Sequence, residues 1–141
     1  MSLTLNRPSE KDAESAIALE TTIDSETADE KTLSFRDLGL NKPIVATLDK
    51  LGMTTPFPIQ AMTISDALAG RDVCGKAKTG SGKTLAFGLP VIQRTTTAKK
   101  RRPRSLILVP TRELANQVAE ALTPFAAATE LWVTAIYGGA S

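Results

Sequence analysis

The segment from Ala77 to Thr84 contains the residue types that bind phosphate groups. Gly80 and Gly82 let the backbone curl tightly, so that successive N–H groups can surround an anion without obstruction by side chains. Lys83 adds a positive charge suited to the β- and γ-phosphates of a nucleotide, and the Thr84 hydroxyl is a suitable oxygen ligand for Mg²⁺. We therefore predict that nucleotide phosphates bind to Ala77, Lys78, Thr79, Gly80, Ser81, Gly82, Lys83 and Thr84.

The position of this loop supports the prediction. It lies between a candidate strand at residues 72–75 and a candidate helix at residues 83–94, the setting that a Walker A loop requires. The positive end of the helix would add to the attraction for phosphate. Ala77 replaces the first glycine of the generic pattern, a replacement typical of certain helicase families. The alternative is a flexible glycine-serine turn with no ligand.

A second candidate site lies upstream, where Phe35 is followed 17 positions later by the segment Gly52-Met53-Thr54-Thr55-Pro56-Phe57-Pro58-Ile59-Gln60. A glutamine amide carries a donor beside an acceptor and can pair with N6 and N7 of adenine, whereas guanine presents acceptors at both positions. An aromatic ring stacked on the base would add affinity without selectivity. Taken singly, Phe35 could be an ordinary core residue and Gln60 a solvated helix residue.

Two further segments have the residue types of a nucleic-acid backbone site. Pro110-Thr111-Arg112-Glu113-Leu114-Ala115 follows an apolar run and opens a candidate helix, and its hydroxyl and guanidinium suit phosphate contacts that carry no sequence information. Gly138 and Gly139 follow another candidate strand and could bring bare backbone close to a ligand. The alternatives are a plain helix cap at Thr111, a surface charge at Arg112 and a simple turn at the glycines.

Together these segments resemble the Q motif, motif I, motif Ia and GG motif of DEAD-box ATP-dependent RNA helicases, over residues 35–141. The resemblance implies that Gln60 reads the adenine edge, that Phe35 packs on its face, and that backbone near Thr55 approaches the base. It also implies RNA contacts from Pro110, Thr111, Arg112, Gly138 and Gly139. Two positions depart from the usual Q motif: Met53 replaces a frequent aromatic, and Phe57 replaces a frequent threonine that would cap the local helix.

These residues lie on predicted helices and strands that alternate along the chain from residue 58 onward. We predict helices at residues 43–50, 58–68, 83–94 and 112–125, and strands at residues 72–75, 105–109 and 131–136. The run at 105–109 is apolar throughout, as in a strand buried on both faces of a parallel sheet. The expected fold is α/β, a P-loop RecA-like doubly wound parallel sheet truncated after about three strands.

Composition divides the chain into three expected parts. Residues 1–33 hold eight acidic and three basic side chains and no aromatic residue, so we expect a disordered acidic tail. A Q-motif segment follows at 34–62, and a truncated helicase ATP-binding domain at 63–141. From residue 34 onward the chain has fourteen basic and seven acidic side chains, and this excess of positive charge suggests an anionic partner. The basic stretch at 99–104 either strengthens RNA binding or is a solvated loop.

Several function classes are excluded or disfavoured. The chain has no histidine, which removes Ser-His-Asp and Cys-His catalysis, and its single cysteine cannot form an internal disulfide. No apolar run is long enough to cross a membrane, and no secretory signal is visible, so we expect a cytoplasmic protein.

We therefore expect an ATP-dependent RNA helicase with ATP and Mg²⁺ as cofactors and RNA as partner. The sequence lacks an Asp-Glu-Ala-Asp segment and the second RecA-like domain of that family, so we expect these 141 residues to be an inactive, aggregation-prone part of a longer enzyme. Two alternatives stay open: a P-loop DNA helicase of a related superfamily, and a truncated product that only binds nucleotide or RNA.

Overall fold

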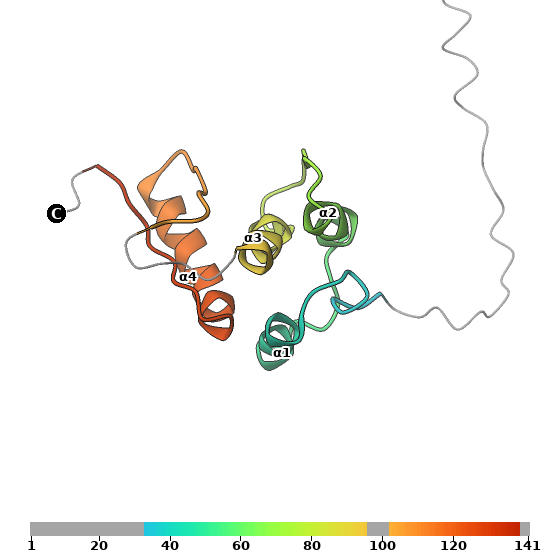
Figure 1. Ribbon diagram of the computed structural model, residues 1–141. Helices are drawn as coiled ribbons and strands as arrows, with labels where there is room; N and C mark the ends of the chain where they lie inside the picture. The colour runs from blue at the N-terminus through green and yellow to red at the C-terminus, as the bar shows by residue number, and fades with distance from the viewer. Residues whose placement is uncertain (1–32, 96–101, 139–141) are drawn as a thin grey trace, which may run out of the picture. The chain divides into compact units, whose positions relative to one another are not determined.

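Four helices account for the regular structure in the computed structural model, which describes residues 33–95 and 102–138 (Figure 1). They are α1 (Lys42–Lys50), α2 (Pro58–Leu68), α3 (Lys83–Arg94) and α4 (Arg112–Ala128). All four predicted helices are confirmed, with α2 and α3 at the predicted bounds. The predicted acidic tail, and the basic stretch up to residue 101, lie outside the described residues.

The helix ends follow local sequence signals. Asn41 caps α1, where its side-chain oxygen accepts from the Ile44 N–H at 3.2 Å, and a proline follows within the first turn. Helix α4 runs three residues past its predicted end. Pro124 lies inside it and removes one N–H, but Phe125 and Ala126 are buried beyond that point and continue the helix.

The helices pack around one apolar core. Helix α3 contacts both α2 and α4, and α1 packs against α4, an arrangement visible in Figure 1. The fully buried side chains of this core include Ile44, Ile64, Leu89 and Leu122. Gly88 lies where α3 meets α4, and a β-carbon there would collide with Leu122. The close approach of these two helices therefore requires glycine at position 88.

The loop at residues 35–40 is fixed to the helices by side-chain hydrogen bonds. On α3, the Gln93 amide donates to the Gly39 carbonyl at 2.9 Å and accepts from the Asn41 N–H at 2.8 Å. On α2, the Ser65 hydroxyl donates to the Leu38 carbonyl at 3.1 Å. In the same loop, Phe35, Leu38 and Leu40 pack into the core.

The three predicted strands do not form a sheet within the described part of the chain. Residues 72–75, 105–109 and 131–136 are assigned to no strand, and no backbone hydrogen bond links one of these segments to another. In the segments at 105–109 and 131–136 the exposure follows a strand-like period of two, since Ile107, Val109, Leu131 and Val133 pack on the core while the residues between them face solvent. Residues 72–75 are all exposed. A strand exists only when a neighbour pairs with it, and none of the three segments has one here.

Candidate nucleotide and nucleic-acid site

Gln60 joins the second segment of the predicted nucleotide site to the phosphate loop. Its side chain is 1% exposed, so the alternative of a solvated helix residue is wrong. The amide oxygen accepts from the Phe57 N–H at 2.8 Å, and the amide nitrogen donates to the Gly82 carbonyl at 3.0 Å. The first bond caps α2 from within, which Phe57 cannot do because its side chain has no acceptor. Gln60 therefore connects the start of α2 to the start of α3.

The amide of Gln60 retains unused hydrogen-bonding capacity. A glutamine side chain has two N–H donors and two oxygen lone pairs, and the two bonds above use one of each. One donor and one lone pair, the set that adenine N7 and N6 require, are therefore left. Burial of the group means that a base reaches it only if its surroundings move.

The phosphate loop is curled as predicted. Gly80 and Gly82 have φ angles of 78° and 81°, in the left-handed region that glycine adopts without strain. A β-carbon at Gly82 would also collide with the Gln60 amide. The Lys83 ammonium donates to the carbonyls of Ala77 and Lys78, both at 2.5 Å, and the Ser81 hydroxyl donates to the Lys78 carbonyl at 2.7 Å. In this conformation the loop's own carbonyl groups bind the lysine that was predicted to bind phosphate.

Three other residues near the predicted base site differ in exposure. Phe35 is 4% exposed and belongs to the hydrophobic core, so its ring offers no open face in this conformation. Thr55 is exposed, in the segment between α1 and α2. Phe57 is 54% exposed, and its ring lies against Gly82 beside Gln60. Phe57, which in the sequence stands out only as a lost cap, is thus an exposed aromatic residue beside Gln60.

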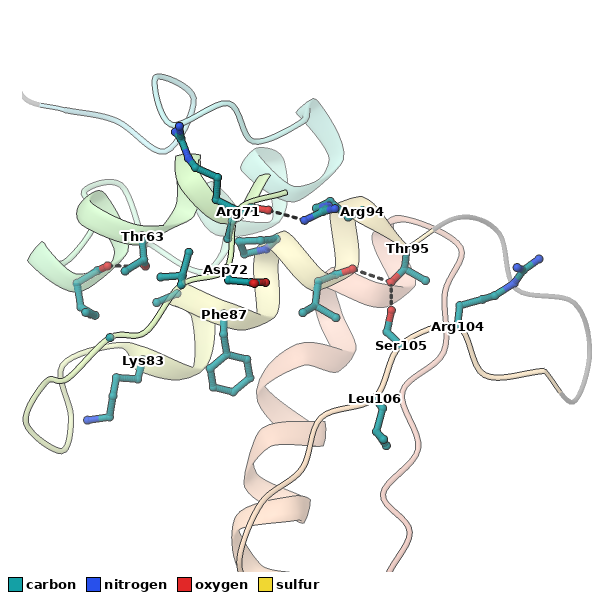
Figure 2. A pocket seen from close by; sticks show the side chains of 17 residues that line it. Thr63, Arg71, Asp72, Lys83, Phe87, Arg94, Thr95, Arg104, Ser105 and Leu106 are labelled. Carbon is teal, nitrogen blue, oxygen red and sulfur yellow. Dashed lines mark hydrogen bonds between the residues drawn. The ribbon is translucent and has the colours of Figure 1, made fainter. Parts of the chain in front are cut away.

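A groove of about 800 Å³ lies between α2, α3 and the segment at 104–106 (Figure 2). Lys83 lies at one end of it, and at the other the hydroxyls of Thr95 and Ser105 are 2.5 Å apart. Since Thr95 already donates to the Val91 carbonyl, Ser105 is the donor in that pair. Much of the lining is aliphatic or aromatic, including Val73, Phe87 and Leu106. The groove separates two predicted strands that do not pair. Gln60 does not line it, and of residues 77–84 only Lys83 does, so the groove does not coincide with the predicted nucleotide site.

The donor set for Mg²⁺ is partial. Thr84 is half-buried in the first turn of α3 and carries one hard oxygen. In the described ranges no group of three or more acidic, cysteine or histidine side chains is gathered as a metal site. A single hydroxyl fits a magnesium ion that takes its other ligands from nucleotide phosphates and water.

The predicted nucleic-acid segments meet at the start of α4. Thr111 caps this helix, and its hydroxyl accepts from the Leu114 N–H at 3.1 Å, which leaves the hydroxyl proton free to donate. Pro110, Thr111 and Arg112 are all exposed. The Arg112 guanidinium carbon lies 5.8 Å from the centroid of the Tyr137 ring, next to exposed Gly138. Gly139 lies outside the described residues.

Comparison with solved structures supports the fold expected from the sequence. The crystal structure of the RNA helicase Prp28 from Chaetomium thermophilum bound to ADP matches with a TM-score of 0.70 and 37% identity, over 77% of this chain and 27% of that one. A DEAD box protein from Methanococcus jannaschii matches with a TM-score of 0.64 and 31% identity, over 77% of this chain and 30% of that one. The structural neighbours are RecA-like DEAD-box helicase domains.

Curated relatives point the same way. DeaD, an ATP-dependent RNA helicase of Escherichia coli K12, is 52% identical over 107 residues, which are 75% of this chain and 17% of that protein. The chloroplastic DEAD-box ATP-dependent RNA helicase 3A of Zea mays is 46% identical over 120 residues, 80% of this chain and 16% of the relative. This chain therefore spans about a sixth of the length of either relative. None of the helices in residues 33–95 and 102–138 combines the length and apolar character needed to cross a membrane.

The model of the DEAD/DEAH box helicase family matches residues 57–141, more than half of the chain. The match includes the end of the Q-motif segment, the phosphate loop and the start of α4. The chain belongs to the DEAD/DEAH box helicase family.

Proposed function

We propose that these residues are the nucleotide-binding part of an ATP-dependent RNA helicase that couples ATP binding and hydrolysis to local RNA unwinding or remodelling. The observation that carries the proposal is the hydrogen bond from Gln60 to the Gly82 carbonyl, which joins the adenine-reading segment to the phosphate loop. The similarity to an ADP-bound RNA helicase structure supports an adenine nucleotide as ligand. The cytoplasmic location stays a prediction.

In this proposal the base binds at Gln60 and the phosphates bind at residues 77–84. Gln60 pairs with adenine through its remaining donor and lone pair, with the backbone near Thr55 close to the base. Lys83 exchanges the carbonyls of Ala77 and Lys78 for phosphate oxygens, a change that its flexible stem allows. The backbone N–H groups of the phosphate loop bind the same oxygens.

Mg²⁺ would neutralise charge on the phosphates once it is bound, and Thr84 would be its ligand from this chain. Because this chain would supply only the Thr84 hydroxyl, metal binding would require the phosphates of the nucleotide. Phosphoryl transfer depends on positioning and electrostatics, and acidic groups that hold metal and water are absent from this sequence. We therefore propose that hydrolysis requires residues outside these 141.

RNA would bind at the start of α4. Thr111 and Arg112, which follow Pro110, offer a hydroxyl donor, a guanidinium and backbone N–H groups to phosphate, with Gly138 as bare backbone nearby. The predicted contact from Gly139 is part of the same proposal. Such contacts position a nucleic acid without reading its sequence. Glu113, in the first turn of α4, would weaken RNA binding there, since its carboxylate repels phosphate.

RNA-stimulated ATPase activity of the complete protein encoded by the surrounding open reading frame tests the proposal. Lys83→Ala should abolish turnover, because the loop loses the ammonium proposed to bind the transferred phosphate. Lys50→Ala, at the exposed end of α1, is the matched control and should leave turnover unchanged. Full activity in Lys83→Ala would contradict the proposal.

The same assay separates the two alternatives. Stimulation by single-stranded DNA, with no response to RNA, would identify a DNA helicase. Nucleotide binding without hydrolysis in the presence of either nucleic acid would identify a protein that only binds its ligands.

A further inference from the structure

Arg112 and Tyr137 contact each other across a long separation in sequence. The guanidinium carbon lies 5.8 Å from the ring centroid, within the range of a cation–π interaction. Arg112 is the first residue of α4, and Tyr137 comes directly before Gly138. Within the described ranges no carboxylate lies at ion-pair distance from Arg112. Among the described residues, the tyrosine ring is the partner of the Arg112 guanidinium.

We propose that Tyr137 is a positioning residue that holds the Arg112 guanidinium ready for an RNA phosphate. The contact joins the start of α4 and the segment before Gly138 into one surface for the nucleic-acid backbone. This inference rests on the proposed function. It adds to that function a role for Tyr137, which orients an arginine from the other segment.

The chemistry of the pair favours this role over that of an ordinary surface contact. The ring contacts the guanidinium through its π-face, whereas the N–H donors of arginine lie in the guanidinium plane. An arginine held over a ring in this way therefore keeps donors available for a bidentate bond to phosphate. A carboxylate in the place of the ring would occupy those donors, cancel the positive charge and repel the ligand. An aromatic ring orients the side chain and leaves its charge intact.

Tyr137 is half-buried, whereas Arg112 is exposed. Ordering an arginine side chain costs rotamer entropy, and a ring that restricts it before binding lowers that cost. The neighbouring Thr111 hydroxyl, already fixed by its bond to the Leu114 N–H, adds a second ordered donor. The contribution of the Tyr137 ring to RNA affinity should therefore depend on the presence of Arg112.

The test is a double-mutant cycle in the complete protein, with binding of single-stranded oligouridylate measured by fluorescence anisotropy over a range of salt concentrations. Tyr137→Leu should weaken binding about two- to fivefold. Tyr137→Phe and Tyr137→Trp, which keep a ring, should bind RNA at least as well as the wild-type protein. Arg112→Ala should weaken binding further and reduce the salt slope by about one. In the Arg112→Ala background, Tyr137→Leu should have no additional effect.

Each contrary outcome is distinct. Tyr137→Leu could weaken RNA binding equally in the wild-type and Arg112→Ala backgrounds, or it could leave binding unchanged while Arg112→Ala weakens it. In either case the positioning role of Tyr137 is wrong, and the proposed RNA surface stands. If Arg112→Ala leaves both affinity and salt slope unchanged, the RNA surface itself is wrong and this inference with it. The ring-retaining variants keep the test decisive if Tyr137→Leu folds poorly, because a loss of RNA affinity in a stably folded Tyr137→Phe protein also contradicts the role.

Discussion

Gln60 shows how one polar side chain can link two functional segments. Its amide joins the start of α2 to the phosphate loop and is nearly inaccessible to solvent. Its residue type and its spacing from Phe35 predicted a base-reading group, but the bond to Gly82 could not be predicted. That contact spans 22 residues and depends on how α2 and α3 pack, which is not encoded locally.

Phe35 and Phe57 are two aromatic candidates for contact with the base. We expect Phe35→Leu to raise KM for ATP and GTP alike if its ring stacks on the base, because stacking does not distinguish purines. If Phe35 is only a core residue, as its burial indicates, the substitution lowers the melting temperature and leaves KM unchanged. Phe57→Leu, which removes the exposed ring, is the matched variant whose KM values for ATP and GTP are compared with those of Phe35→Leu. Steady-state kinetics of the complete protein with each nucleotide provide the readout.

Thr111 both caps α4 and is proposed to donate to RNA, and one substitution separates these roles. Aspartate is a good N-cap residue, but its charge repels phosphate. We expect Thr111→Asp to keep stability near that of wild type while weakening RNA binding strongly. Thr111→Ala should lose about 1 kcal/mol of stability. Thermal unfolding and RNA binding of both variants are the measurements, and unchanged RNA affinity in Thr111→Asp would leave Thr111 as a cap alone.

Among the elements, the described residues contain all four predicted helices but have no assigned strand, for a physical reason. Helix ends depend on signals within a few residues, such as the Asn41 cap and the prolines at positions 43 and 58. A strand depends on a partner elsewhere in the chain. The run at 105–109 has the composition of a buried strand, yet Leu106 and Leu108 are 80% and 84% exposed, since none of the described residues pairs with that segment or covers that face.

The contact between α3 and α4 leads to a stability prediction. Gly→Ala in a helix interior usually stabilises, but at position 88 the added methyl would collide with fully buried Leu122. We expect Gly88→Ala to destabilise the protein by about 1–3 kcal/mol, the usual cost of overpacking. Chemical denaturation of the complete protein measures this.

Leu122→Ala provides the control for that prediction. In its background Gly88→Ala should cost less, because the colliding methyl groups are gone. Equal costs in both backgrounds would show that Leu122 is not the cause.

At the scale of the whole molecule, the described residues leave much apolar surface uncovered. Trp132 is 93% exposed and Ile136 is 87% exposed, on one of the segments that was predicted to be a strand. Such surface usually marks an interaction site or an aggregation liability. This exposure would be relieved if the segments at 72–75, 105–109 and 131–136 were paired with further strands, as they would be in a RecA-like sheet.

The single tryptophan reports on such pairing directly. In the isolated chain, Trp132 fluorescence should resemble that of a solvated indole and be readily quenched by acrylamide. In the complete protein, emission from the same residue, with any other tryptophans replaced, should be blue-shifted and protected. We also expect the isolated chain to aggregate or to lack a cooperative unfolding transition. Protected emission together with dispersed amide NMR signals from the isolated chain would contradict this.

The central claim, that Gln60 and the phosphate loop bind the two ends of one ATP molecule, is tested most directly by the ratio of kcat/KM for ATP to that for GTP. It is measured in the complete protein with saturating RNA, and as a ratio it does not depend on the folded fraction. Gln93→Ala is the matched control, since that glutamine also makes two hydrogen bonds but at the 39–41 loop. We predict that Gln60→Ala brings the ratio toward one while Gln93→Ala leaves it at the wild-type value. An unchanged ratio in Gln60→Ala would contradict the claim.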